Sequence, residues 1–476
     1  MLKFCALAVT ALLSAPVLAA PPVIYGEDNR LEVYEAPELH QKLAASAVAM
    51  IEKTKLTRTQ EKPGLVQIAQ STFRQWLESQ FDEEEKLNLD EKITFCPGER
   101  FTEQPNAALC SGFLVGPDLV VTAGHCVAVA NFCENYSWVF DYQLDPVTLS
   151  AGVDVPEENV YECKRVISTA LSPALGLDYG LIQLDRRVKG RTGLPLRSEG
   201  ALTDDTNLVV IGNPSGLPLK VSGGARVRTN IHPNYFSAKL DTFQGNSGSA
   251  VINADTGVVE GILVRGEEDF EANTGLMCIE AKRCADGECR GEDVSRMTSI
   301  PEIAARDALL RLAEKGDERG VEKLLKNKFW IDVYGNDGVT ALMAAARSNE
   351  IPMMELLLDN GADPKLTDAE GSTVLHHLAT GLTKKSRRML RTLLAAGADL
   401  EARNLSSETA LLVAARSLNL TGVKLLIKAG ADVTAMNAQN ENALAPFLRA
   451  GNTRAVQDLV KLGVSAAEQN TSLEMN

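Results

Sequence analysis

The sequence reads Thr122-Ala123-Gly124-His125-Cys126 directly after an apolar run, and Gly245-Asn246-Ser247-Gly248-Ser249 directly before another. Between them, Leu177-Asp178-Tyr179-Gly180-Leu181-Ile182 places an acid at the head of a third run. A serine hydroxyl becomes a strong nucleophile only when an imidazole accepts its proton, and the imidazole needs a carboxylate to fix its tautomer. The pattern therefore predicts a catalytic triad of His125, Asp178 and Ser247.

Such a reaction also needs backbone N–H groups that stabilise the developing oxyanion. A glycine before the nucleophile lets the backbone turn inward, so we assign the donors to Gly245 and Ser247. Asp185 and Asp141 are the alternative acids, and His232 stands outside any comparable motif. Acyl transfer of this kind needs neither a metal nor another cofactor, and we expect none.

Short apolar runs continue on both sides of these motifs, as in residues 111–115 and 257–264. They are rich in β-branched residues and are bounded by turn-forming residues, which predicts an all-β sandwich or barrel domain over residues 20–300. Residues 37–86 are the exception, because their apolar residues follow a helical spacing. We expect a helical insertion or a propeptide there. The two stripes are Leu39, Leu43, Ala47, Met50 and Phe73, Trp76, Leu77, Phe81.

A repeating pattern begins near Ile303. The triplets that start at Thr340, Thr373, Thr409 and Asn442 recur at intervals of 33, 36 and 33 residues, and Gly-Ala-Asp triplets keep step with them. This period, with two helical stretches per unit, resembles ankyrin repeats. The resemblance implies an all-α solenoid of about five repeats over residues 303–470 that binds a protein partner.

The order His, Asp, Ser and the three local motifs resemble the chymotrypsin-like (trypsin-like) serine proteases over residues 22–298. The start at residues 23–30 and the Gly-Asn-Ser-Gly-Ser motif are similar to the bacterial glutamyl endopeptidase branch. The resemblance implies two six-stranded barrels with the active site between them, and serine endopeptidase activity. It also implies a Cys110–Cys126 bridge that braces the His125 loop, with Cys133–Cys163 as a further pair. The pairing of Cys96, Cys278, Cys284 and Cys289 stays open.

Substrate preference depends on a few further positions. Asp241 lies where the trypsin pattern has the acid that selects Arg or Lys, although an acid near this position in the glutamyl branch has a structural role. Leu263 replaces the histidine of glutamyl endopeptidases, so basic substrates are favoured over acidic ones. Arg265 is left to contact acidic side chains or solvent. The remaining substrate-binding candidates are Val264 and Gly266.

Asn246 also departs from the trypsin pattern. Trypsin-like enzymes have an aspartate there, and it forms a salt bridge with a newly cut N-terminus during activation. An amide side chain carries no charge and forms no such salt bridge. We therefore do not expect that activation switch.

Residues 1–19 have the pattern of a signal peptide, with Lys3, an apolar run and small residues before a cleavage site at Ala19 or Ala20. The run is too short to span a bilayer. Eight cysteines remain after Cys5 leaves, all before residue 290, and an even number in an exported protein predicts disulfides. We expect a secreted or periplasmic protein without a membrane segment after cleavage.

The acidic charge is concentrated in the first part of the chain. Residues 301–476 hold 21 Lys and Arg against 22 Asp and Glu, so residues 1–300 carry almost the whole net charge of −15. This excess argues against a nucleic-acid partner. Two functions follow: a secreted serine endopeptidase whose repeats bind a protein, or a secreted ankyrin-repeat binding protein with an inactive or self-inhibited protease-like domain.

Overall fold

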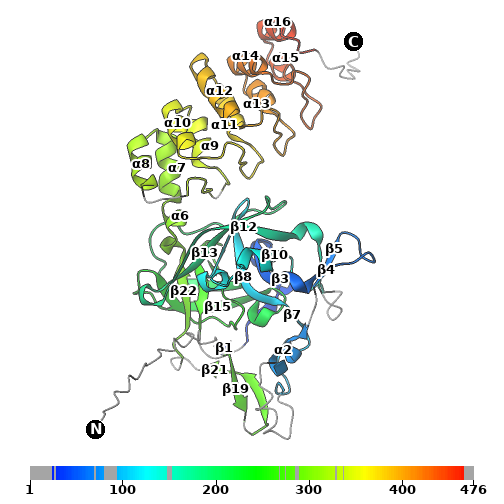
Figure 1. Ribbon diagram of the computed structural model, residues 1–476, viewed down its shortest axis with the longest axis vertical. Coiled ribbons are helices and arrows are strands. Elements are labelled where there is room, and N and C mark those ends of the chain that lie inside the picture. Colours follow the sequence, from blue (N-terminus) through cyan, green and yellow to red (C-terminus); the bar gives the residue numbers. More distant parts are fainter. Residues whose placement is uncertain are drawn as a thin grey trace, which may run out of the picture.

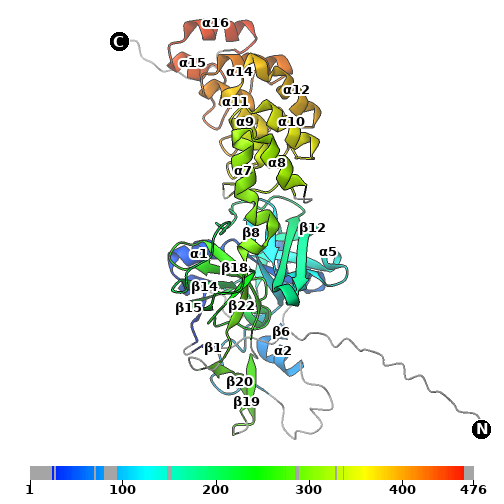
Figure 2. The same cartoon turned by 90° about the vertical axis from the view of Figure 1, so that its left-hand side faces the viewer.

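The structure, a computed structural model, describes residues 24–25, 28–68, 71–79, 94–146, 153–266, 269–273, 275–284, 289–326, 330–335 and 337–465. Strands form the lower part of the molecule, and a column of helices rises above them (Figures 1 and 2). The expected signal peptide lies outside the described residues. Within those residues, none of the helices combines the length and apolar character that crossing a bilayer requires.

The first barrel is a closed ring of six antiparallel strands in the order β10-β12-β13-β9-β8-β3. Its main apolar cluster includes Phe113 and Trp138, both fully buried. The strands are β3 (Ala47–Glu52), β8 (Ala108–Gly116), β9 (Leu119–Thr122), β10 (Tyr136–Phe140), β12 (Val160–Ser172) and β13 (Leu177–Leu184).

The second barrel has the order β14-β17-β18-β22-β16-β15 and closes through pairing of β14 with β15, while β2 (Arg30–Glu32) adds to β15. Each of the six strands contributes to one apolar cluster, through Leu208, Ala225, Phe236, Val251, Leu263 and Val294. The predicted pair of six-stranded barrels is confirmed. The strands are β14 (Asn207–Gly212), β15 (Lys220–Thr229), β16 (Tyr235–Ala238), β17 (Ala250–Asn253), β18 (Val259–Arg265) and β22 (Glu292–Arg296).

Short elements surround the barrels. The helices are α1 (Glu38–Ala44), α2 (Phe73–Ser79), α4 (Gly124–Val127) and α5 (Phe132–Asn135). The strands are β1 (Ile24–Tyr25), β4 (Leu56–Arg58), β5 (Leu65–Ile68), β6 (Ser71–Thr72), β7 (Pro105–Asn106), β11 (Asp154–Pro156), β19 (Phe270–Asn273), β20 (Cys278–Ala281) and β21 (Arg283–Cys284).

The prediction of a helical insertion over residues 37–86 is wrong for most of the described part of that stretch. Only α1 and α2 are α-helical, and Ala47 and Met50 lie on β3, which pairs with β8 and β10. Since β3 is almost entirely buried, its apolar run lacks the alternation that separates a strand from a helix. Loss of β3 would open the first barrel, which argues against a removable propeptide.

The described C-terminal part contains five helix pairs, consistent with the predicted solenoid. The glycines that follow the second helix of each of the three central pairs have the positive φ expected at the end of a helix, from +90° at Gly361 to +103° at Gly430. The link α6 (Pro301–Ala304) leads into them. The pairs are α7 (Arg306–Lys315) with α8 (Glu318–Leu325), α9 (Ala341–Arg347) with α10 (Ile351–Asp359), α11 (Val374–Gly381) with α12 (Arg387–Ala395), α13 (Ala410–Arg416) with α14 (Leu420–Ala429), and α15 (Ala445–Arg449) with α16 (Thr453–Lys461).

The repeats are joined to the barrels by a buried contact as well as by the chain. Tyr334 is 3% exposed and packs over Gly116 at the end of β8, so closely that a Cβ there would lie 2.7 Å from the tyrosine ring. The guanidinium of Arg187 donates to the carbonyl oxygens of Thr367, at 3.1 Å, and Asp368. The array is therefore packed against the barrel domain as well as linked to it through the chain.

A buried acid at this junction gives a pH-dependent stability. Asp332 is 8% exposed, its Oδ1 accepts from the Asp363 amide at 3.1 Å, and burial raises its pKa from 3.8 to about 6. The free energy of unfolding therefore begins to fall as the pH rises above about 4, and the loss is complete once the pH exceeds about 6, where the buried carboxyl is ionised. We expect Asp332→Asn to stabilise the protein by about 1–3 kcal/mol at pH 8 and hardly at all at pH 4.

Urea unfolding of the wild type and of Asp332→Asn at the two pH values measures this difference. The exposed Asp359, at the end of α10, provides the matched control, and Asp359→Asn should leave the unfolding midpoint unchanged at both pH values. An equal effect of Asp332→Asn at pH 4 and pH 8 would contradict the assignment of the buried charge.

Candidate active site

His125 lies in α4, which begins two residues after β9 ends. The start of α4 approaches the β12–β13 hairpin so closely that only glycine fits at position 124. A Cβ on Gly124 would lie 2.2 Å from the carbonyl oxygen of Ala170. The hairpin carries Asp178 near the start of β13, so the close approach brings imidazole and carboxylate together.

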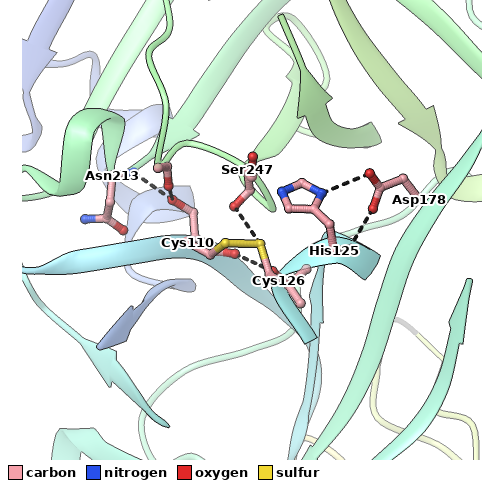
Figure 3. The surroundings of a disulfide bond; sticks show 9 residues. Cys110, His125, Cys126, Asp178, Asn213 and Ser247 are labelled. Atoms are coloured by element: carbon pink, nitrogen blue, oxygen red, sulfur yellow. Dashed lines mark hydrogen bonds and ion pairs between the residues drawn. A yellow bond between two sulfur atoms is a disulfide. The ribbon is translucent and has the colours of Figure 1, made fainter. Parts of the chain in front are cut away.

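Asp178 holds His125 at two points. Its Oδ2 lies 2.9 Å from Nδ1 of the imidazole, and its Oδ1 accepts from the His125 backbone amide at 3.1 Å. The Asp178 side chain is 3% exposed, whereas that of His125 is 32% exposed. Figure 3 shows the imidazole between Asp178 and Ser247, with its second nitrogen on the Ser247 side. The double contact fixes the orientation of the ring and leaves this nitrogen facing the serine.

The loop that carries Ser247 is anchored to the first barrel. The Ser247 carbonyl oxygen accepts from the Ser111 amide of β8 at 2.8 Å, and Gly248 has a φ of +91°. A Cβ on Gly248 would lie 2.0 Å from the Ser111 carbonyl oxygen. The Cys126 sulfur is 3.8 Å from the Ser247 carbonyl oxygen, a simple contact because a disulfide sulfur has no proton to donate. The candidate nucleophile therefore sits on the seam between the barrels.

Two amides in this loop have no acceptor among the described residues. The amides of Asn246 and Gly248 donate to the carbonyl oxygens of Phe243, at 3.0 Å, and Leu263, at 2.8 Å. Those of Gly245 and Ser247, the predicted oxyanion donors, make no such bond. The buried Asn246 side chain is also engaged, because its Oδ1 accepts from the Ser249 hydroxyl at 2.6 Å. The free N–H groups are thus the two that flank Asn246.

Asp241 does not offer a free carboxylate. Its Oδ1 accepts from the Tyr25 amide at 2.7 Å and its Oδ2 from the Asn29 amide at 3.1 Å. The residue is 4% exposed, and burial raises its pKa to about 6. The geometry favours the structural interpretation of this acid over that of a pocket base that binds Arg or Lys.

The other substrate-binding candidates lie at the end of β18. Val264 is 1% exposed, main chain included, and belongs to the apolar core, so neither its side chain nor its backbone is open to solvent. Arg265 is half-buried, and its Nε lies 3.9 Å from Oδ2 of Asp293. The Gly266 carbonyl oxygen accepts from the guanidinium of Arg290 at 3.3 Å.

The alternative residues make contacts elsewhere. Asp141 accepts from Arg191 at 2.5 Å, and Asp185 pairs with Arg186 at 2.9 Å. The His232 ring packs against that of Tyr235 in a tilted arrangement, with centroids 4.1 Å apart. Neither alternative acid has a hydrogen bond to His125 among the described contacts.

Ser111 is a site residue that no sequence motif singles out. Its amide binds Ser247 and its hydroxyl donates to the Gly245 carbonyl oxygen at 3.3 Å, so it contacts both ends of the three-residue turn. The Ser111 carbonyl oxygen accepts from the Thr122 hydroxyl at 2.6 Å. Its position beside Cys110, which is bonded to the cysteine after His125, is the only local signal.

Four disulfides hold the barrel half together. Cys110 is bonded to Cys126 beside the site, and Cys133 to Cys163. The two pairs left open by the sequence are Cys96–Cys278 and Cys284–Cys289. Among the described residues, the group with metal-ligand geometry is Cys110, His125 and Cys126. Because both sulfurs are consumed by the disulfide, neither is a thiolate able to bind a metal.

Comparisons with known proteins agree with this division of the chain. Residues 110–262 match the family model of the trypsin-like peptidase domain. Residues 309–404 and 351–437 match the model of ankyrin repeats in three copies. A search of curated proteins found no match.

Proposed function

We propose that this chain, which carries a trypsin-like peptidase domain and ankyrin repeats, is a serine endopeptidase that hydrolyses peptide bonds in protein substrates. The observation that carries the proposal is the two-point contact of Asp178 with His125 beside Ser247. These three residues then form the catalytic triad, and the free amides of Gly245 and Ser247 form the oxyanion hole.

The proposed reaction follows from this placement. Ser247 Oγ attacks the peptide carbonyl carbon while Nε2 of His125 takes the hydroxyl proton, and Asp178 stabilises the imidazolium. The N–H groups of Gly245 and Ser247 donate to the oxyanion. His125 passes its proton to the leaving amine, the C–N bond breaks, and an acyl-enzyme remains. A water molecule, deprotonated by His125, then attacks the acyl carbon; the ester bond to Oγ breaks, His125 returns the proton to Ser247, and the acid leaves without the help of a cofactor.

The end of β18 beside the nucleophile has no strand partner on one side among the described residues, although Val264 and Gly266 are buried. β17 pairs with β18 as far as Ile262, and the Leu263 carbonyl oxygen accepts from the Gly248 amide. Beyond Leu263, no described strand covers that side of β18. We expect the substrate backbone to pair with residues 264–266 as an added strand does at a sheet edge, which requires the groups that cover Val264 and Gly266 to move.

Exposed aliphatic side chains flank the hairpin that carries Asp178. This apolar rim comprises Leu171 and Leu175 of the hairpin and Ile231 of the loop before β16, which is 94% exposed. The Asn234 side chain donates to the Leu175 carbonyl oxygen at 2.8 Å, which ties the loop to the hairpin. Substrates with large aliphatic side chains fit this surface. A preference for basic substrates loses its support, because the Asp241 carboxylate is occupied.

The repeats are proposed to bind a protein at a fixed position relative to the site. They extend away from the barrels in both views (Figures 1 and 2), and Gly116 and Arg187, which they contact, lie outside the candidate site. This arrangement favours recruitment over autoinhibition. The four disulfides are compatible with a secreted or periplasmic location, which belongs to the proposal together with kinship to the glutamyl endopeptidase branch.

Digestion of a peptide library by the purified full-length protein tests this function. We expect endoproteolytic cleavage, with large aliphatic residues enriched near the cut, and its loss in Ser247→Ala. The alternative is an exported ankyrin-repeat binding protein with an inactive or self-inhibited protease-like domain. It predicts no cleavage by the wild type and no reaction with a serine-directed fluorophosphonate.

A further inference from the structure

We infer that Asp241 is a positioning residue that ties the start of the described chain to the loop bearing the oxyanion donors; the inference rests on the proposed function. Both carboxylate oxygens accept backbone amides of one short segment, Tyr25 at 2.7 Å and Asn29 at 3.1 Å. The segment, here called the N-terminal clamp, comprises Ile24, Tyr25 and Asp28–Arg30. A carboxylate shared by two amides holds a backbone in place better than one bound once.

The N-terminal clamp also covers the loop through side chains. Ile24 is fully buried against Phe243, and its amide donates to the Lys282 carbonyl oxygen at 3.1 Å. The Arg30 guanidinium lies 4.1 Å from the centroid of the Phe243 ring and forms an ion pair with Asp28 at 2.6 Å. Phe243 is therefore enclosed by the clamp two residues after Asp241.

Further hydrogen bonds connect the N-terminal clamp to Gln244, the residue directly before the proposed oxyanion donor Gly245. The Gln244 amide donates to Oδ2 of the buried Asp269 at 2.8 Å, and the Asp269 carbonyl oxygen accepts from the Lys282 amide at 2.9 Å. Lys282 is also the residue that binds Ile24. Residues 241–244 are thus held at three points, and the next amide is that of Gly245. Release of the clamp should shift this donor away from the oxyanion.

The positioning role and a substrate-binding role make different predictions. To bind Asp241, a Lys or Arg side chain of the substrate would have to displace the two backbone amides from the carboxylate. Both buried amides would then lack a hydrogen-bond acceptor. If Asp241 binds substrate, its loss impairs only substrates with Lys or Arg at the cleaved bond. If Asp241 positions the loop, kcat falls equally for all substrates, because oxyanion stabilisation does not depend on the side chain.

The test uses full-length Asp241→Asn and Asp241→Ala with three peptides that differ only in having Lys, Leu or Glu before the cleaved bond. We expect kcat to fall roughly 10- to 100-fold for every peptide the wild type cleaves, with their ratio unchanged. Hydrogen exchange at the amides of Tyr25 and Asn29 should become faster. Asp255→Asn, at an exposed acid in a turn, is the matched control and should change neither readout.

Selective loss with the Lys peptide, no loss of kcat, or unchanged exchange at the two amides would each overturn the inference. Where Asp241→Ala fails to fold, Asn29→Pro replaces it, since proline removes one clamped N–H and leaves the carboxylate in place. That variant should lower kcat uniformly, whereas a substrate-binding carboxylate would keep or gain activity on the Lys peptide. Hydrogen exchange needs no catalysis, so it tests the clamp even if the wild type proves inactive.

Discussion

Replacing Ser247 with alanine is expected to lower kcat for peptide hydrolysis by about 10⁶-fold. The variant removes the only atom that forms the acyl-enzyme in the proposed mechanism, so the triad loses its function as a unit. Since Ser247 is half-buried and its loop is held through backbone contacts to Ser111, the alanine should leave the fold intact. Steady-state kinetics on one peptide, with thermal unfolding as the check of folding, measures the effect.

His125→Ala and the double variant with Ser247→Ala sharpen this test. Residues that act as one unit show non-additive losses, so the double variant should be no slower than either single one. Ser237→Ala, at a β16 serine whose hydroxyl bonds Thr229 instead, is the matched control and should retain wild-type kcat. Retention of more than a few per cent of wild-type activity in Ser247→Ala would rule out this serine as the nucleophile.

Asp178→Asn is expected to lower kcat by about 10⁴-fold without unfolding the barrel. Asparagine keeps the size of the side chain but places an amide donor against Nδ1 of His125. The imidazole must then carry its proton on Nε2, the nitrogen that should accept from Ser247. The carboxylate is almost fully buried, so no other group replaces its charge beside the imidazolium.

Asp185→Asn is the control for this prediction, because Asp185 is one of the two alternative acids and pairs with Arg186 on the surface. We expect it to keep kcat within a factor of about two, since exposed ion pairs contribute little. A larger loss of kcat in Asp185→Asn than in Asp178→Asn would show that Asp178 is not the acid of the triad. So would equal activity of Asp178→Asn and the wild type at neutral pH.

Elements that are marked by a short sequence pattern can be predicted from the sequence alone. The short apolar runs predict strands, and the repeated Thr and Gly markers predict the solenoid, because each repeat is one helix pair. β3 cannot be predicted in this way, because a strand buried along nearly its whole length lacks the alternation of apolar and polar residues. Its identity depends on pairing with β8 and β10, which lie about 60 or more positions away.

In the candidate site too, local motifs are predictable from the sequence and long-range contacts are not. Sequence motifs suffice to propose His125, Asp178 and Ser247, because each side chain sits in a short stretch with its own turn chemistry. The role of Asp241 does not follow, because its partner Tyr25 is 216 residues away. The Cys96–Cys278 pair spans 182 residues and likewise has no local signal. Contacts of this kind are set by how the barrels close.

The most direct test of the central claim is the covalent reaction of the full-length protein with a fluorophosphonate, followed by intact mass and peptide mapping. We expect one adduct per chain, located on the peptide that contains Ser247, and none in Ser247→Ala or in the wild type denatured before treatment. A folded wild-type protein that forms no adduct, or carries it on another residue, would contradict the proposed site.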